Sequence, residues 1–245
     1  MAEAGTGENL VVLVHGVLDT SRSFAGVIKL LASECRMLTY DRRGYGRSTE
    51  AAGVPVDVTA HIDDLLQVLD GRRAVVVGHS FGGVVALGAA VRSPELIDAV
   101  VLYESGMAWT PGWDDTTMLA MLGSADAEEA GLRLLLGDQY DTAPEERRTR
   151  LRRQASAFIA EESSTRIAER PPYAMADVRV PVVYGTGDQP AAFAPVEAHL
   201  RDVADAHIVR LAGAGHVAHR THPEQFADLV RLGLRRRAAE ISAAS

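Results

Sequence analysis

The chain has 245 residues, a formal net charge of −8 and 47% hydrophobic residues, the composition of a globular domain with a sizeable core. The acidic balance argues against a nucleic-acid partner, because phosphate binding needs a basic footprint. No apolar run reaches the roughly 18–20 residues of a membrane span, the first residues lack the pattern of a signal peptide, and one cysteine, Cys35, excludes a disulfide framework. From these features we expect a soluble protein of the cytoplasm with no membrane partner, and the excess of Arg over Lys indicates a GC-rich bacterial source.

Short apolar runs rich in β-branched residues alternate with longer helical patterns along the chain. Apolar runs without polar alternation predict strands buried on both faces, as in a parallel sheet covered by helices. The sequence therefore predicts an α/β fold: a doubly wound, mostly parallel sheet of about six strands with right-handed crossovers. In chain order, the predicted strands are 10–14, 37–40, 74–77, 99–103, 180–184 and 207–211, and the predicted helices between or after them are 23–33, 58–69, 81–92, 191–203 and 223–236.

The alternation of strands and helices breaks once, between residues 105 and 177. This segment contains no convincing strand but has helical patterns, including 128–136 and 145–159. Because roughly 70 residues are too many for a structureless connection in a compact domain, we expect a helical cap inserted before the penultimate strand. Residues 1–104 and 178–245 would then form the core.

Ser80 lies in Gly78-His79-Ser80-Phe81-Gly82, directly after one predicted strand and directly before a helix. A serine in such a sharp turn is held clear of the sheet, and small neighbours tolerate the strained backbone. The following helix offers the Phe81 N–H to a developing negative charge, and the turn after the first strand would offer the Val17 N–H as a second donor. This context indicates a nucleophile with an oxyanion hole.

His216 follows the last predicted strand in a glycine-rich loop, Gly213-Ala214-Gly215-His216. The carboxyl edge of the sheet carries both this loop and Ser80, so the imidazole could take the serine proton as a general base. His219 and His222 follow, but no acidic or cysteine companion accompanies them, and we expect no metal and no cofactor.

Two carboxylates could orient the imidazole of His216, and the sequence leaves the choice open. Asp188 ends a Gly-Thr-Gly-Asp turn after one predicted strand, and Glu104 follows another. Either could fix the tautomer of the ring and stabilise its cation. The Gly-Thr-Gly-Asp turn before a helix favours Asp188 as the acid, with Glu104 as the alternative.

Five motifs occur in order: HGV at residues 15–17, DRRGYGRS at 41–48, GHSFGG at 78–83, GTGD at 185–188 and GAGH at 213–216. Together they resemble the capped, esterase-like branch of the α/β-hydrolase superfamily over almost the whole chain. The resemblance implies Ser80 as nucleophile, His216 as base, and Val17 and Phe81 as oxyanion-hole amides. Most relatives take the acid after the penultimate strand, which matches Asp188, and some take it one strand earlier, which matches Glu104. The family usually has a β-hairpin before the first predicted strand, and only about nine residues precede it here, so we expect a smaller sheet of roughly six strands.

The sequence predicts a serine hydrolase that cleaves an ester, lactone or thioester of a moderately large, apolar small molecule, a carboxylic ester hydrolase above all. Bulky residues of the cap, including Trp109, Trp113 and Met118, are expected to line the substrate pocket. The alternatives are a lyase, acyl-transfer or carbon–carbon cleavage reaction with the same triad, or a binding protein without hydrolytic activity. We expect a monomer or a homodimer.

Overall fold

One seven-stranded sheet forms the centre of the molecule, with the strand order β1-β3-β2-β4-β5-β6-β7. The structure, a computed structural model, describes residues 1–49, 56–167 and 170–244, and of residues 237–244 the backbone alone. All strand pairs are parallel except β1, which runs antiparallel to β3. The strands are β1 Ala2–Ala4, β2 Asn9–Val14, β3 Cys35–Thr39, β4 Ala74–His79, β5 Ile97–Tyr103, β6 Val182–Thr186 and β7 His207–Arg210.

The predicted α/β architecture is confirmed, with one strand more than the six that the sequence indicated. The additional strand, β1, has three residues and pairs Ala2 with Thr39 at one edge of the sheet. Its three residues, Ala-Glu-Ala, are too few and too exposed to show the apolar run of a buried strand.

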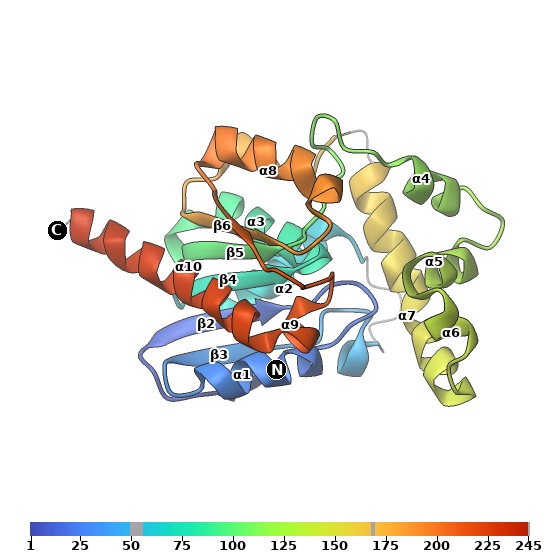
Figure 1. Cartoon of the computed structure of the whole chain (residues 1–245), viewed down its shortest axis with the longest axis horizontal. Helices are drawn as coiled ribbons and strands as arrows, with labels where there is room; N and C mark the ends of the chain where they lie inside the picture. Colours follow the sequence, from blue (N-terminus) through green and yellow to red (C-terminus); the bar gives the residue numbers. More distant parts are fainter. Residues whose placement is uncertain (50–55, 168–169, 245) are drawn as a thin grey trace.

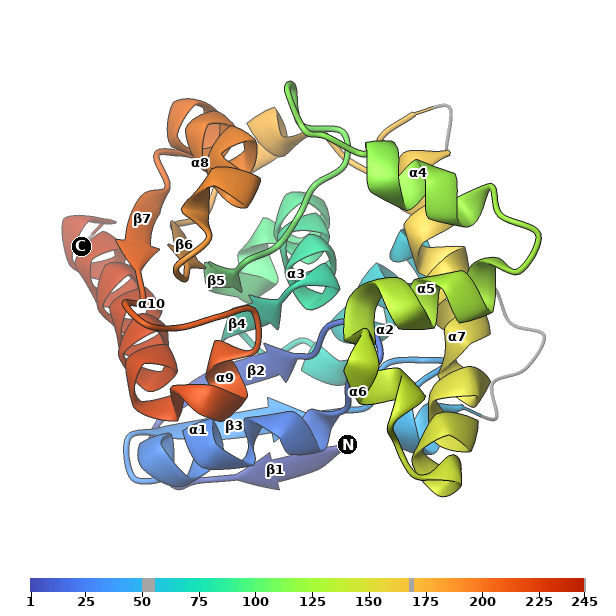
Figure 2. The same ribbon diagram turned by 45° about the vertical axis from the view of Figure 1, so that its right-hand side comes forward.

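Helices cover both faces of the sheet and form the cap (Figures 1 and 2). Residues of α2, α3 and α8 join one hydrophobic cluster, whereas residues of α1 and α10 join another on the opposite face. In β2, Val12 belongs to the first cluster and its neighbours Val11 and Leu13 to the second, which explains the continuous apolar run. The α-helices are α1 Ala25–Leu31, α2 Val58–Leu69, α3 Phe81–Arg92, α4 Thr116–Leu122, α5 Ala127–Leu136, α6 Asp138–Asp141, α7 Glu145–Arg166, α8 Pro190–Ala204, α9 Ala218–Thr221 and α10 Pro223–Ala244.

The helical insertion expected before the penultimate strand is present as α4 to α7, between β5 and β6. These helices gather on one side of the sheet in Figure 1, with α7 nearest to it. None of the helices in the described ranges has the length and apolarity needed to cross a membrane.

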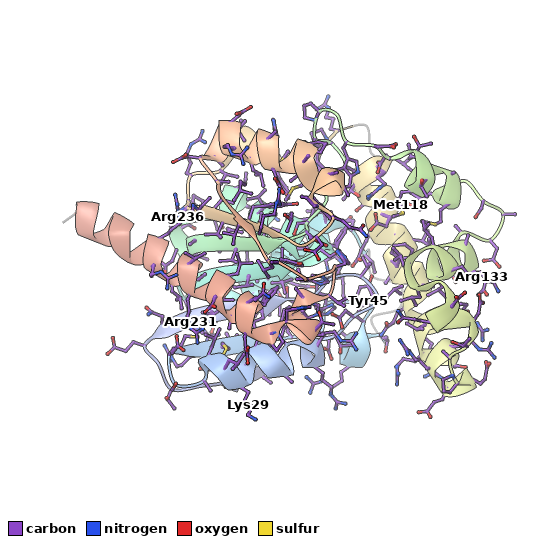
Figure 3. All side chains as sticks on the ribbon, in the orientation of Figure 1. Lys29, Tyr45, Met118, Arg133, Arg231 and Arg236 are labelled. Atoms are coloured by element: carbon purple, nitrogen blue, oxygen red, sulfur yellow. The ribbon has the colours of Figure 1, made fainter. Side chains whose placement is uncertain are left out.

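A buried cluster of charged and polar groups joins the cap to the core. Arg42, which follows β3, donates to Glu161 of α7, and the Tyr45 hydroxyl donates to the other oxygen of Glu161 at 2.6 Å. The side chains of Arg42 and Glu161 are fully buried, and His61 of α2 pairs with the same carboxylate. Tyr45 is seen between the sheet and the cap in Figure 3. Burial alone would raise the pKa of Glu161, but the charges of Arg42 and His61 bring that pKa below its ordinary value.

Candidate active site

Ser80 occupies the turn between β4 and α3, with a backbone conformation that side chains rarely adopt. Its φ is 53° and its ψ is −127°. Two glycines allow the chain to pass closely around it: a Cβ on Gly16 would lie 2.9 Å from the Ser80 Cβ, and a Cβ on Gly82 would lie 2.2 Å from the Val14 carbonyl oxygen. The turn expected from the sequence is therefore formed, and its glycines are required by close backbone approach.

Residues with strained backbone conformations are concentrated at this edge of the sheet. Among the described residues, five that are not glycine have a positive φ: two of them, Asp70 and Asp205, end helices in the left-handed conformation that is common there. The other three, Leu18, Ser80 and Glu104, line one cavity. Such conformations cost free energy and persist where a functional site requires them, so they mark the cavity as the place to look for chemistry.

His216 lies in the loop after β7, which neighbouring side chains hold at the edge of the sheet. The Tyr103 hydroxyl donates to the Gly215 carbonyl at 2.9 Å, and His79 Nε2 lies 2.7 Å from the His216 carbonyl oxygen. Because a carbonyl can only accept, this nitrogen of His79 carries a proton. Burial, and then the nearby His219 and His216, keep the pKa of His79 well below its usual value, so the ring is neutral.

Glu104 is the carboxylate that contacts His216. Its Oε2 lies 2.8 Å from His216 Nδ1, and its Oε1 accepts a hydrogen bond of 2.8 Å from the Gly187 N–H. Glu104 is 4% exposed, so water competes little for these bonds. With the Nδ1 proton directed at Glu104, the Nε2 of His216 is the ring nitrogen left to accept a proton.

Asp188, which the sequence favoured, does not reach the imidazole of His216. Its carboxylate is exposed and accepts from the Gly213 N–H at 2.9 Å, while its own N–H donates to the Ala214 carbonyl. Asp188 thus braces the loop that carries His216. The Gly-Thr-Gly-Asp turn also acts through its backbone, since Gly187 fixes the second oxygen of Glu104.

Ser80, His216 and Glu104 line a single cavity of about 580 Å³ between the edge of the sheet and the cap. Val17 and Phe81 line it as well. Phe81 is the first residue of α3, so its N–H has no acceptor within the helix, and the Val17 N–H donates to no group of the described residues. Both amides are available to a ligand in the cavity.

Two of the three cap residues expected in the pocket line this cavity. Trp113 and Met118 do, and Met118 projects from the cap in Figure 3. Trp109 does not: its ring packs edge-to-face on Tyr173, with 5.1 Å between ring centroids, and against the core. The expectation for Trp109 was wrong because an apolar pattern does not distinguish a pocket wall from the support behind it.

The cavity wall includes residues that were not predicted from the sequence to line the pocket. Phe193 of α8 stacks on His216 with ring centroids 6.3 Å apart and packs on Trp113. Glu162 and Arg166 of α7 add an ion pair beside the apolar side chains of the cap, and Arg166 also pairs with Asp115 at 2.7 Å. Burial raises the pKa of Glu162 to about 7, although Arg166 opposes the shift. None of these residues belongs to a sequence motif from which its place in the cavity could be predicted.

Three groups beside Ser80, His216 and Glu104 are of types that bind metal ions and lie close together. The side chains of Asp19, His79 and His219 have ligand atoms within 4.8 Å of one another. In the structure His219 Nε2 contacts Asp19 Oδ2 at 3.1 Å, and the Nδ1 atoms of both histidines have no hydrogen-bond partner among the described residues. This set was not predicted from the sequence, because its members are far apart in the chain.

Comparison with known proteins agrees with this architecture. The model of the alpha/beta hydrolase family matches residues 11–229, so the chain belongs to that family. The enol-lactonase from Burkholderia xenovorans has 21% sequence identity and a TM-score of 0.75, and the comparison covers 96% of this chain and 95% of the enol-lactonase. A thermophilic esterase from Thermogutta terrifontis has 22% identity and a TM-score of 0.71, with 96% and 92% covered. At these identities the likeness concerns the fold.

Curated relatives match part of their length only. The uncharacterized protein Rv2715 of Mycobacterium tuberculosis is 37% identical over 106 residues, which are 42% of this chain and 30% of that protein. The first curated relatives are matched over 30% to 40% of their own length.

Proposed function

We propose that the protein is a serine hydrolase that cleaves an ester, lactone or thioester of a moderately large, apolar small molecule. Ser80 is the nucleophile, His216 the general base and Glu104 the acid that orients it. The hydrogen bond of 2.8 Å between His216 Nδ1 and Glu104 Oε2, beside the strained turn of Ser80, carries this proposal. The core comprises residues 1–104 and 178–245, and the cap of residues 105–177 covers the site.

The reaction follows from the roles of these groups. The Ser80 hydroxyl attacks the carbonyl carbon of the substrate while its proton passes to His216 Nε2, and the N–H groups of Val17 and Phe81 stabilise the oxyanion. Glu104 stabilises the imidazolium, which then protonates the leaving alcohol or thiol. A water molecule deprotonated by His216 hydrolyses the acyl-enzyme and regenerates Ser80.

The cavity supports an apolar acyl group. Trp113, Met118 and Phe193 line it beside Leu135 and Leu136 of the cap, and about 580 Å³ is a typical volume for a small-molecule site. The apolar wall favours an acyl chain next to Ser80 over a polar one.

Labelling with a fluorophosphonate probe followed by mass spectrometry tests the nucleophile. We expect the probe on Ser80 and turnover of p-nitrophenyl acyl esters by the wild-type protein. Ser80→Ala should remove the label and lower kcat on the order of 10⁴–10⁶-fold, with unchanged circular dichroism, and His216→Ala should be comparably damaging.

Ser93→Ala is the matched control, because Ser93 ends the same helix that Ser80 begins. It should keep the label and the activity. Labelling of folded Ser80→Ala protein, or wild-type-like turnover by it, would overturn the proposal.

A further inference from the structure

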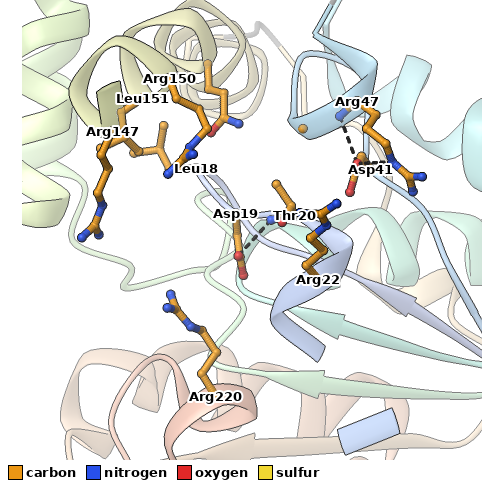
Figure 4. Close-up of a pocket in the computed structure, with 12 residues that line it drawn as sticks. Leu18, Asp19, Thr20, Arg22, Asp41, Arg47, Arg147, Arg150, Leu151 and Arg220 are labelled. Carbon is orange, nitrogen blue, oxygen red and sulfur yellow. Dashed lines mark hydrogen bonds and ion pairs between the residues drawn. The ribbon is translucent and has the colours of Figure 1, made fainter. Parts of the chain in front are cut away.

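A second cavity, of about 620 Å³, adjoins the catalytic one and is lined by arginines (Figure 4). Leu18, Asp19 and Arg220 line both cavities, so the two share a wall. Leu18 directly follows Val17, whose N–H belongs to the proposed oxyanion hole. The two cavities are therefore neighbours, and Arg220 borders both of them.

The arginines of the second cavity come from four separate parts of the chain. Arg147 and Arg150 project from α7 of the cap, Arg220 projects from α9 toward Asp19, and Arg22 and Arg47 follow β2 and β3 (Figure 4). The tertiary structure thus gathers five guanidinium groups around one space in a chain whose formal net charge is −8.

Most of this positive charge is not neutralised. Arg47 pairs with Asp41 at 3.3 Å, but the side chains of Arg22, Arg147, Arg150 and Arg220 form no ion pair with any residue that the structure describes. Against five arginines the lining has two aspartates, an excess of three positive charges.

Both aspartates are committed to other partners. Asp41 accepts from Ser21 and Arg47, and Asp19 accepts from the Thr20 N–H and contacts His219. Burial alone would raise the pKa of each carboxyl, but these hydrogen bonds hold both pKa values below the ordinary range. The aspartates are therefore ionised, yet their oxygens are already engaged.

One neutral polar side chain also belongs to the lining. Gln154 of α7 lines the cavity and is 3% exposed as a residue. Its side-chain amide can donate to an oxygen atom of a ligand held there.

We propose that this arginine pocket (Arg22, Arg147, Arg150 and Arg220 with Gln154) binds a phosphate group carried by the alcohol or thiol portion of the substrate. The inference rests on the proposed function, because the apolar wall of the catalytic cavity takes the acyl chain and leaves the other portion to extend toward Arg220. Guanidinium groups match phosphate oxygens in paired hydrogen bonds, and a doubly charged phosphate balances the excess charge better than a carboxylate.

The test compares acyl esters of alkanediols that carry either a terminal phosphate or a free hydroxyl, across a series of spacer lengths. For the wild-type protein we expect kcat/KM to be higher for the phosphorylated ester at one or more spacer lengths. In the double variant Arg147→Gln/Arg150→Gln, the ratio of phosphorylated to neutral kcat/KM should fall roughly tenfold to a hundredfold. Inorganic phosphate should compete with the phosphorylated ester, and less well in the double variant.

Arg153→Gln is the matched control, because Arg153 is an exposed residue of α7 that does not line the pocket. It should preserve the wild-type ratio. Equal kcat/KM for both esters at every spacer length, a preference for a terminal carboxylate over phosphate, or an equal loss in Arg153→Gln would each overturn the inference. Hydrolysis of the neutral esters that depends on Ser80 would still support the proposed function, so the two failures are distinguishable.

Discussion

The edge of the sheet and the cap contribute to the same cavity in different ways. At the edge of the sheet, Glu104, His216 and Ser80 are positioned by strand ends and by hydrogen bonds of 2.7 to 2.9 Å that hold the loop of His216. The cap contributes apolar walls and charged groups from α7, and one buried ion-pair cluster around Glu161 joins that helix to the core. Catalytic groups require sub-ångström placement, which the edge of the sheet can provide. Substrate binding tolerates more variation, and the cap supplies the walls for it.

The largest loss of activity is expected from a substitution at the edge of the sheet. Glu104→Gln should lower kcat on an activated ester by up to about 10⁴-fold, because an amide favours the wrong tautomer of His216. Asp188→Asn is the matched control and should cost less than about tenfold, because Asp188 holds the backbone of the loop and not the ring. Circular dichroism checks the fold of both variants, and a larger loss in Asp188→Asn would assign the acid to Asp188.

The junction between the cap and the core should show the next largest effect, in stability. Glu161→Gln leaves the buried charge of Arg42 without its carboxylate and should lower the free energy of unfolding by about 3–5 kcal/mol. Glu145 lies at the other, exposed end of the same helix, and Glu145→Gln should leave the melting temperature nearly unchanged. Equal destabilisation by the two substitutions would show that the buried cluster does not hold the cap.

The contributions of Glu161 and Glu162 of α7 to the free energy of unfolding should change with pH in opposite directions. Glu162 has a folded pKa of about 7, above its ordinary 4.5, so its contribution to stability is complete below pH 4.5 and is lost as pH rises through 7. Relative to Glu162→Gln, the free energy of unfolding of the wild type should fall by about 3 kcal/mol over this window. The pKa of Glu161 is lowered, so its contribution is present above its ordinary pKa and is lost as pH falls. Chemical denaturation between pH 4.5 and 7.5 measures the contribution of Glu162, and denaturation below pH 4.5 measures that of Glu161. A pH-independent difference between the wild type and Glu162→Gln would contradict the assignment.

The smallest effect concerns substrate size. Trp113→Ala should lower kcat/KM for long-chain acyl esters relative to the shortest one by about tenfold, because remote apolar contacts act through binding energy. Trp109→Ala is the control: this residue packs on Tyr173 behind the cavity, so it should lower stability without changing the chain-length preference. A uniform loss across the series in Trp113→Ala would count against a role in selectivity.

Local signals in the sequence were sufficient for the architecture and for proposing Ser80 and His216 as nucleophile and base. Most of the longer strands were predicted because strands buried on both faces have continuous apolar runs, as β2 does, whereas β7 lies at the edge of the sheet and is exposed at both ends. Ser80 and His216 were identifiable because each stands in a glycine-containing turn directly after a strand. Each of these two signals lies within a few consecutive residues of the chain.

The tertiary structure decided which carboxylate meets the imidazole, since both Asp188 and Glu104 follow strands and only their side-chain contacts distinguish them. Glu104 follows β5, the neighbour of β6, and the Gly187 N–H just after β6 donates to one oxygen of Glu104 while the other contacts His216. The arginine pocket likewise joins residues more than a hundred positions apart in the chain, such as Arg22 and Arg150, which no local pattern connects. Sequence periodicity reports which face of an element is buried, whereas the partner of a polar side chain depends on the packing of elements against one another.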